Sequence, residues 1–320
     1  MRSVVERDID IAREAVRRIP MLWCLEDSDV FITRLGGLTN LVFRVDLGGE
    51  QYVLRVPGRG TEEYINRANE EVATREAARV GVSPDVLYFD AQSGLMLTRL
   101  IDNAVTMTPA KFEERRGAPA RAARAFRTLH RSRAQFKSRF ELFRMIDDYL
   151  AVLAGKDVKL PDGYHDVLQE AEGVRAALGA HPLPIVACHS DPLCENFLDD
   201  GQRMWIVDWE YSGMNDPMWD LGDLSVEGEF DEQQDEEMIA AYFEGEPTPA
   251  ERGRIVIYKA MCDLLWTLWG LIQFANGNPA DDFWAYSINR FERCKRLMAK
   301  PDFARHVGAV RRGRPRRVDP

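Results

Sequence analysis

Residues 189–196 read His-Ser-Asp-Pro-Leu-Cys-Glu-Asn, and residues 205–210 read Trp-Ile-Val-Asp-Trp-Glu. The first stretch follows a short apolar run at 184–187, and the second closes another at 204–207, as expected of two β-strands. A hairpin would bring the polar ends of these strands to one place in the fold. The spacing His-x-Asp-x4-Asn, followed by a strand that ends in Asp, therefore predicts a site built from two loops.

Three side chains of these loops, Asp191, Asn196 and Asp208, offer oxygen atoms. Phosphoryl transfer needs such a set, because one carboxylate accepts the proton of the attacking hydroxyl group while a second carboxylate and an amide hold Mg²⁺ against the phosphates. Taken singly, Asp and Asn mostly cap turns and helices, so only the spacing of the whole motif favours chemistry. A thiolate metal site around Cys188 and Cys194 is the alternative, but no second Cys or His pair lies near enough in sequence to complete four ligands.

The predicted secondary structure changes from mostly strand to mostly helix near residues 98–104. Before this point, short runs separated by Gly pairs predict a mostly antiparallel sheet with one internal helix. The strands are expected at 30–35, 41–47, 51–56, 86–89 and 95–100, and helices at 6–19 and 61–79. Beyond this point, helices are expected at 109–130, 139–153, 165–178, 216–229, 231–243, 249–274 and 281–298.

The expected fold class is α+β, with a small antiparallel β-rich N-lobe over residues 1–101 and a larger, mainly helical C-lobe over residues 102–310. A cleft between two such lobes is where a ligand would bind. The basic tail, 311–320, contains Arg-Gly-Arg-Pro, which resembles the core of minor-groove-binding hooks. A disordered basic terminus is the simpler interpretation of this tail.

The chain is acidic, with 42 Lys and Arg against 52 Asp and Glu and a formal net charge of −10. Because residues 311–320 hold five Arg and one Asp, the remaining body carries −14. Such a charge argues against binding to nucleic acids or anionic membranes and suits a cationic ligand. The five cysteines are scattered, the N-terminus has no apolar leader, and the longest apolar stretch, 264–275, is shorter than the ~20 residues of a membrane span. We therefore expect a cytoplasmic protein with reduced thiols.

Five motifs resemble those of the choline/ethanolamine kinase branch of the aminoglycoside-phosphotransferase-like, protein-kinase-like superfamily, and those of bacterial choline kinases most of all. The motifs are Leu35–Asn40, Tyr52–Gly58, His189–Asn196, Val207–Gly213 and Asn215–Leu221. The resemblance implies a protein-kinase-like two-lobe fold that binds ATP and Mg²⁺ between the lobes and phosphorylates a small amino alcohol. A protein kinase is disfavoured, since no Asp-Phe-Gly follows the second strand and no Ala-Pro-Glu ends an activation segment.

The resemblance also assigns roles within the two loops. Asp191 matches the catalytic base, and Asn196 and Asp208 match the magnesium ligands. Ser190 departs from the family, which commonly has asparagine at this position. The set of base and ligands is intact, which argues against a kinase-like protein that binds nucleotide without turnover.

The nucleotide-binding residues implied by the resemblance come from the N-lobe. Arg55 stands where protein kinases keep a lysine, and its planar fork suits phosphate oxygens. Glu70 matches the glutamate that orients this basic residue, with Glu71 as the alternative. The remaining positions are Gly36, Gly37, Thr39 and Asn40, in the loop over the phosphates, and Arg99 and Ile101, in the hinge segment 98–102 whose backbone would pair with adenine.

The acceptor site is implied by the resemblance as well. Trp266 and Trp269 lie three residues apart and share one helix face, which alone would indicate core residues. Choline kinases place a tryptophan pair of this helix against the choline head group, and Glu210, Tyr211 and Glu227 match further acceptor-site positions. An aromatic face attracts a desolvated quaternary ammonium by roughly 1–2 kcal/mol. The expected acceptor is therefore choline, with ethanolamine as an alternative; an aminoglycoside would want several exposed carboxylates and few aromatic residues, and thiamine is a further cationic candidate.

Overall fold

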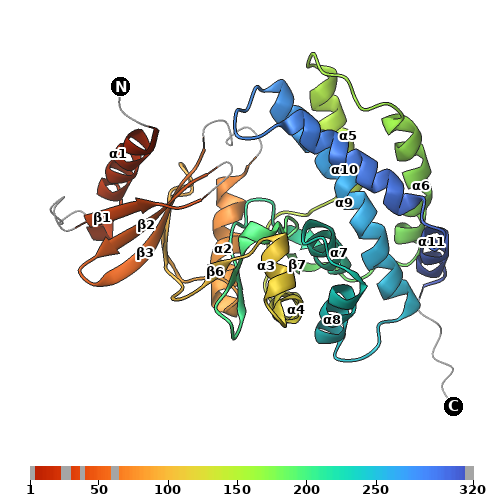
Figure 1. The fold of residues 1–320 in the computed structure, drawn as a ribbon, viewed down its shortest axis with the longest axis horizontal. Helices are drawn as coiled ribbons and strands as arrows, with labels where there is room; N and C mark the ends of the chain where they lie inside the picture. The colour runs from red at the N-terminus through yellow and green to blue at the C-terminus, as the bar shows by residue number, and fades with distance from the viewer. Residues whose placement is uncertain (1–3, 23–29, 37–39, 59–64, 314–320) are drawn as a thin grey trace.

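The computed structural model describes residues 4–22, 30–36, 40–58 and 65–313, which form two lobes (Figure 1). The N-lobe is built on a five-stranded antiparallel sheet in the order β1-β2-β3-β5-β4. Its strands are β1 Val30–Arg34, β2 Leu41–Leu47, β3 Glu50–Val56, β4 Val86–Phe89 and β5 Met96–Arg99. Each strand ends within one residue of its predicted bounds, so the predicted sheet is confirmed.

Helix α1 (Val4–Arg17) packs on one face of this sheet. Alternate residues of β2, Phe43 and Val45, are fully buried, as the period of two in a strand requires. Ala12 and Val16, four residues apart on α1, belong to the same core cluster. The N-lobe therefore has a small hydrophobic core of its own.

The C-lobe is mainly helical and is arranged around the long helix α9 (Pro249–Ala275), which packs against α5, α6, α7, α10 and α11. The other helices of this lobe are α3 Pro109–Glu114, α4 Ala118–His130, α5 Leu142–Ala154, α6 Tyr164–Ala180, α7 Met218–Glu227, α8 Glu232–Phe243, α10 Phe283–Met298 and α11 Phe303–Arg312. By length and composition α9 is long enough to cross a bilayer, so the expectation that no apolar segment reaches that length is wrong. Because 89% of its most apolar window is buried inside the protein, α9 is placed as a core helix.

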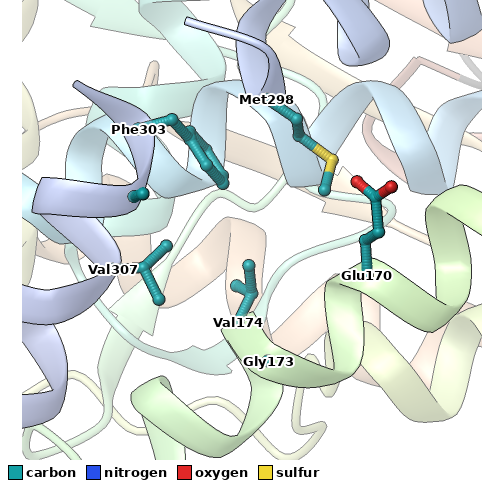
Figure 2. Close-up of a pocket in the computed structure, with 7 residues that line it drawn as sticks. Glu170, Gly173, Val174, Met298, Phe303 and Val307 are labelled. Atoms are coloured by element: carbon teal, nitrogen blue, oxygen red, sulfur yellow. The ribbon is translucent and has the colours of Figure 1, made fainter. Parts of the chain in front are cut away.

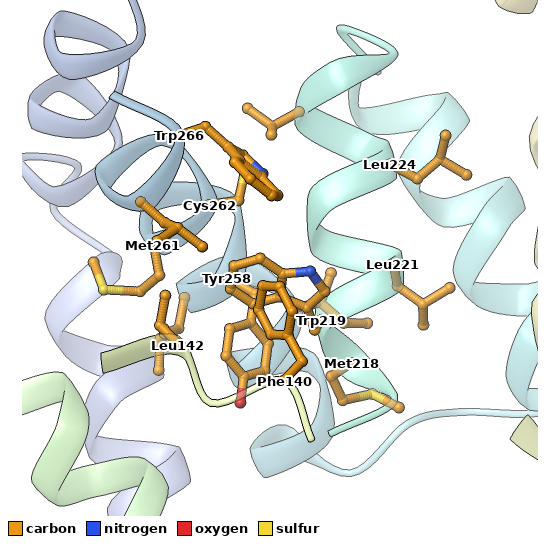
Figure 3. Packing of buried hydrophobic residues seen from close by; sticks show 14 of the residues in the cluster. Phe140, Leu142, Met218, Trp219, Leu221, Leu224, Tyr258, Met261, Cys262 and Trp266 are labelled. Atoms are coloured by element: carbon orange, nitrogen blue, oxygen red, sulfur yellow. The ribbon is translucent and has the colours of Figure 1, made fainter. Parts of the chain in front are cut away.

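Large side chains fill the space between α7 and α9 (Figure 3). The Trp219 ring lies 5.4 Å from the Tyr258 ring and 4.8 Å from the Phe140 ring, measured between centroids. The indole N–H of Trp219 also donates a hydrogen bond of 3.0 Å to the Ser190 carbonyl. The core of the C-lobe thus supports the polar loop 189–196 directly.

Helix α2 (Arg67–Val80) follows the first three strands in sequence but packs into the C-lobe. Its buried Ala77, and Val82 just beyond it, belong to the same core cluster as α9. The carbonyl of Val82 accepts a hydrogen bond of 2.8 Å from Ile206 N–H, and Ser83 Oγ accepts one of 3.1 Å from the Trp209 indole. The boundary expected at residue 101 therefore does not coincide with the boundary between the two hydrophobic cores.

Some short elements differ from the prediction. The sequence does not predict β6 Val105–Thr106, β8 Phe197–Asp199, β10 Gly213–Asn215 or α11. Strands of two or three residues are too short to show a period of two. The helix expected at 109–130 is divided into α3 and α4 by a turn at 115–117. Helix α11 includes Arg311 and Arg312, so the expected tail begins two residues later, and residues 314–320 lie outside the described residues.

Candidate active site

Two short strand pairs bring the polar loops together. Strands β8 and β9 (Met204–Ile206) form the antiparallel hairpin, and β7 (Val186–Cys188) pairs with β10. Across the hairpin, Val207 N–H donates to the Asn196 carbonyl at 2.9 Å, and the Val207 carbonyl lies 2.9 Å from His189 Nε2. These bonds join the ends of the two loops, but the predicted hairpin between the strands at 184–187 and 204–207 is wrong, because β7 pairs with β10 and β9 pairs with β8.

A buried carboxylate, Asp220, holds the turn that precedes Asp191. Its oxygens accept hydrogen bonds of 2.8 Å from the backbone N–H groups of both His189 and Ser190. His130 Nε2 lies 3.0 Å from the same carboxylate, so a side chain of α4 supports it from behind. Ser190 has a φ of 70°, in the left-handed region where asparagine is far more frequent than serine. The departure at residue 190 is thus a strained position whose backbone is fixed by Asp220.

The carboxyl group of Asp191 lies in a crowded acidic environment. Burial, followed by the charge of Glu227, raises the pKa of Asp191 to about 7, while Arg290 opposes this shift. Asn196 Nδ2 donates to the Asp191 carbonyl at 3.0 Å, which leaves the amide oxygen of Asn196 as its metal-ligating atom. A carboxyl group with a pKa near neutrality is suited to accept and release a proton at physiological pH.

The predicted nucleotide-site residues of β3 and α2 meet the second loop. Arg55 forms a buried ion pair with Glu70, and its Nη1 lies 3.4 Å from Asp208 Oδ1. Glu71 instead pairs with Arg75 at 2.9 Å near the surface, so Glu70 is the glutamate that contacts Arg55. Burial and then the charge of Glu210 raise the pKa of Asp208 well above its usual value, and Arg55 opposes them.

Glu210 lies between the lobes and not with the aromatic acceptor residues where we expected it. Its Oε1 accepts hydrogen bonds from Arg67 Nη1 at 2.6 Å and from Asn40 Nδ2 at 3.0 Å, and lies 3.6 Å from Arg55. Arg67 also pairs with Glu70 at 2.7 Å. The sequence analysis did not include Arg67, although its spacing of three residues from Glu70 on one helix is a signal for such a pair.

The residues around Asp208 fit a magnesium ion. Carboxylate oxygens of Glu70, Asp208 and Glu210 lie within 4.8 Å of one another. These donors are oxygen atoms, which Mg²⁺ prefers over nitrogen and sulfur ligands. The predicted ligand Asn196 lies at the adjoining loop end, where its backbone carbonyl accepts the Val207 N–H. The raised pKa of Asp208 reflects negative charge that a bound cation would relieve.

Parts of the predicted phosphate loop and hinge are described. Gly37 and Thr39 lie outside the described residues, whereas Asn40 is buried and accepts the Gly58 N–H at 3.3 Å. The carbonyl of Gly36 accepts a bond of 2.5 Å from Arg34. In the hinge, exposed Arg99 pairs with Glu50 at 3.6 Å, and Ile101 lies two residues after the end of β5. The roles of these residues toward phosphate and adenine stay predictions.

An aromatic group forms next to the second loop. The Tyr211 and Trp266 rings are perpendicular with centroids 5.4 Å apart, and the Trp269 indole donates to the Tyr211 hydroxyl at 2.9 Å. Tyr286 of α10, which the sequence analysis did not include, lies 5.8 Å from Trp269 between ring centroids. Glu227 lies at the end of α7 and forms a bidentate ion pair with Arg290, at 2.6 and 2.8 Å. The structure therefore brings Tyr211, Trp266 and Trp269 together.

A separate pocket lies at the far end of the C-lobe, between α6 and the α10–α11 connection (Figure 2). Val174, Met298, Phe303 and Val307 line it, with Glu170 at its edge. None of the site residues predicted from the sequence lines this pocket.

Comparisons with known proteins agree with this geometry. Residues 32–254 match the model of the phosphotransferase enzyme family, APH. A crystal structure of a choline/ethanolamine kinase family protein from Mesorhizobium loti is 64% identical, with a TM-score of 0.88 over 96% of this chain and 100% of that chain.

Two further solved structures are similar. The choline kinase LicA from Streptococcus pneumoniae is 28% identical, with a TM-score of 0.77 over 92% of this chain and 99% of that one. LicA in complex with AMP is also 28% identical, with a TM-score of 0.74 over 91% of this chain and 97% of that one.

Proposed function

The chain belongs to the choline/ethanolamine kinase family, and on that premise we propose that it transfers the γ-phosphoryl group of ATP to the hydroxyl group of choline with Mg²⁺. Ethanolamine is the alternative acceptor. The observation that supports this function most is Asp191, a half-buried carboxyl group with a pKa of about 7, on a loop joined by hydrogen bonds to the strand end that carries Asp208. We also propose that the enzyme acts in the cytoplasm.

The proposed reaction uses this chain's residues in separate roles. Asp191 would accept the proton of the choline hydroxyl as its oxygen attacks the γ-phosphorus, and ADP would leave. Asp208 and Asn196 would hold Mg²⁺, which supplies positive charge against the phosphates. Arg55, fixed between Glu70 and Asp208, would place a permanent positive charge at the nucleotide.

The aromatic group favours choline over a polycationic sugar. Two aromatic faces, at roughly 1–2 kcal/mol each, would contribute about a hundredfold in affinity for a quaternary ammonium. An aminoglycoside would want several exposed carboxylates, whereas the side chain of Glu227 is only 9% exposed and is paired with Arg290. The relatives named choline and ethanolamine kinase support the same class of acceptor.

An ADP-release assay with choline, ethanolamine, thiamine and an aminoglycoside tests the proposed function. We expect turnover with choline, and a fall in kcat of about 10²–10⁴ in Asp191→Asn, because general-base assistance is lost while nucleotide binding is kept. Asp157→Asn, at an exposed position, is the matched control. Turnover with thiamine or the aminoglycoside but with neither amino alcohol would overturn the proposed acceptor, and near-normal turnover in Asp191→Asn would remove the base from its role.

Trp269→Ala tests the aromatic part of the acceptor site. Loss of one face should raise the KM for choline at least tenfold while the KM for ATP changes less than twofold, because the ring contacts Tyr211 and Trp266 and none of the predicted nucleotide-binding residues among the described ones. Trp284→Ala, which removes a tryptophan that is 38% exposed on α10, is the matched control. Equal effects on both KM values would make Trp269 a core residue.

A further inference from the structure

The carboxylate of Glu227, expected to attract the acceptor, is already engaged by arginine. Arg290 donates to both of its oxygens, at 2.6 and 2.8 Å, and Arg293 reaches one of them at 3.4 Å. The Arg290 guanidinium also lies 4.5 Å from the centre of the Tyr286 ring. Glu227 therefore has its charge balanced and a fixed position without any substrate.

A second carboxyl group on the same helix face has no such partner. Asp223 lies four residues before Glu227 on α7, is 1% exposed, and neither of its oxygens receives a hydrogen bond within the described residues. Its oxygens lie within 4.8 Å of ligand atoms of Glu227 and of the Cys262 thiol, which is a weak donor. Buried polar groups in native proteins almost always have a partner, so an unpartnered carboxyl group one helical turn from Glu227 is a candidate to receive a ligand.

The charges around this site point to the sign of that ligand. Arg290 and Arg293 both contact Asp263, at 3.2 and 2.7 Å, in addition to Glu227. The two guanidinium groups thus balance the charges of two carboxylates, Glu227 and Asp263. Neither guanidinium group forms an ion pair with Asp191 or Asp223. Asp191 is reserved for the proton of the reacting hydroxyl, whereas Asp223 would be balanced by one monovalent cation.

We propose that Asp223 is the carboxylate that receives the ammonium group of the acceptor, and that Glu227 is a positioning residue that holds Arg290 against Tyr286. This inference rests on the proposed function. An ammonium that carries N–H groups would donate hydrogen bonds to the Asp223 oxygens, whereas a quaternary ammonium offers only charge and methyl contacts. Asp223 therefore favours ethanolamine relative to choline, while the aromatic group favours choline.

Binding at Asp223 should be coupled to proton release. Burial raises the pKa of Asp223 well above its usual value, with Glu227 and Asp191 adding to the shift and Cys262 and Arg290 opposing it. A cation that binds there stabilises the ionised form of Asp223, so binding should favour release of a proton from this carboxyl group. The KM for the acceptor should fall as pH rises, because less of the free enzyme then carries this proton.

Asp223→Asn keeps the shape of the side chain and removes its charge. We expect the KM for ethanolamine to rise at least tenfold, and by a larger factor than the KM for choline. The KM for ATP should change less than twofold. Glu227→Gln should change the two acceptor KM values by similar factors, because it acts through Arg290. If Glu227→Gln raises the KM for ethanolamine by a larger factor than the KM for choline, and Asp223→Asn leaves both KM values unchanged, then Glu227 is the ammonium ligand and the inference is wrong.

Calorimetry of acceptor binding without ATP, in two buffers of different ionisation enthalpy, gives a readout that does not depend on turnover. Asp191→Asn, which lacks a neighbouring carboxyl group whose pKa is also raised, should still release protons when ethanolamine binds. Absence of proton release there would overturn the inference. Wild-type enzyme inactive on both amino alcohols would instead overturn the proposed function, whereas active wild-type enzyme with an unaltered Asp223→Asn variant would overturn only this inference.

Discussion

At the scale of single residues, the buried carboxyl group of Asp223 would favour cation binding but lower the stability of the ligand-free protein. A carboxyl group whose pKa is raised in the folded state binds a proton more tightly there than in the unfolded chain. The free energy of unfolding therefore decreases as pH rises above the unfolded pKa of about 4 and continues to decrease until the folded pKa is passed. The ligand-free protein should be stabilised by removing this ionisable group.

We expect Asp223→Asn to raise the Tm of the ligand-free protein, and the difference from wild type to grow between pH 5 and pH 8. Thermal unfolding followed by circular dichroism across this range provides the measurement. Asp263→Asn is a contrasting control, because its carboxylate is held by two arginines and its loss leaves their charges unpaired. A lower Tm for Asp223→Asn at pH 8 would show that Asp223 stabilises the empty fold.

The sequence predicts some site residues well and others not at all. Asp191, Asn196 and Asp208 could be predicted as candidates because their spacing along the sequence is itself the signal. Asp223 and Arg290 were not, since their relation arises only when α7 and α10 pack together. Pairing between buried charges far apart in sequence has no local pattern, and for this reason the contacts of Glu210 with Arg67 and Asn40 were not predicted.

At the scale of elements, the approach of α10 to α9 fixes the aromatic group. Gly270 of α9 faces Tyr286 and Ser287 of α10, and a Cβ atom added at Gly270 would lie 2.6 Å from the Tyr286 ring. The long helix α9 is predictable from its apolar composition, as are most helices of the C-lobe. Which helix it contacts is not, because a fully apolar helix presents no preferred face.

Gly270→Ala should separate α9 from α10 and move Tyr286 away from Trp269. Overpacking of this kind costs about 1–3 kcal/mol, and the KM for the acceptor should rise more than the KM for ATP. Gly173→Ala, in α6, meets no atom within 4 Å and should stabilise the protein by roughly 0.5–1 kcal/mol. Steady-state kinetics and urea unfolding of both variants measure these KM values and free energies of unfolding. Equal free energies of unfolding for the two variants would mean that α10 adjusts to the added methyl group without strain.

At the scale of the whole molecule, the lobes are linked by buried charge as well as by the chain. Glu210 of the C-lobe accepts hydrogen bonds from Asn40 and Arg67 of the N-terminal hundred residues. The two-lobe fold is predictable because the sequence pattern changes clearly from strands to helices near residue 100. The placement of α2 in the C-lobe core is not, since its buried alanines would suit either lobe.

The pair formed by Arg67 and Glu210 should couple α2 to the second loop energetically. Their side chains are 7% and 6% exposed and their atoms are 2.6 Å apart, so removing either partner takes the nearest opposite charge from a buried group, although Glu70 still contacts Arg67 and Arg55 lies 3.6 Å from Glu210. We expect Arg67→Met and Glu210→Gln each to cost about 3–5 kcal/mol in urea unfolding, and the double variant to cost less than their sum by roughly 1–3 kcal/mol. The exposed pair of Arg144 and Asp148, at 3.8 Å, is the matched cycle and should show coupling below about 0.5 kcal/mol. Additive effects in the Arg67–Glu210 cycle would contradict this expectation, because an ion pair that carries no coupling energy does not hold α2 against the second loop.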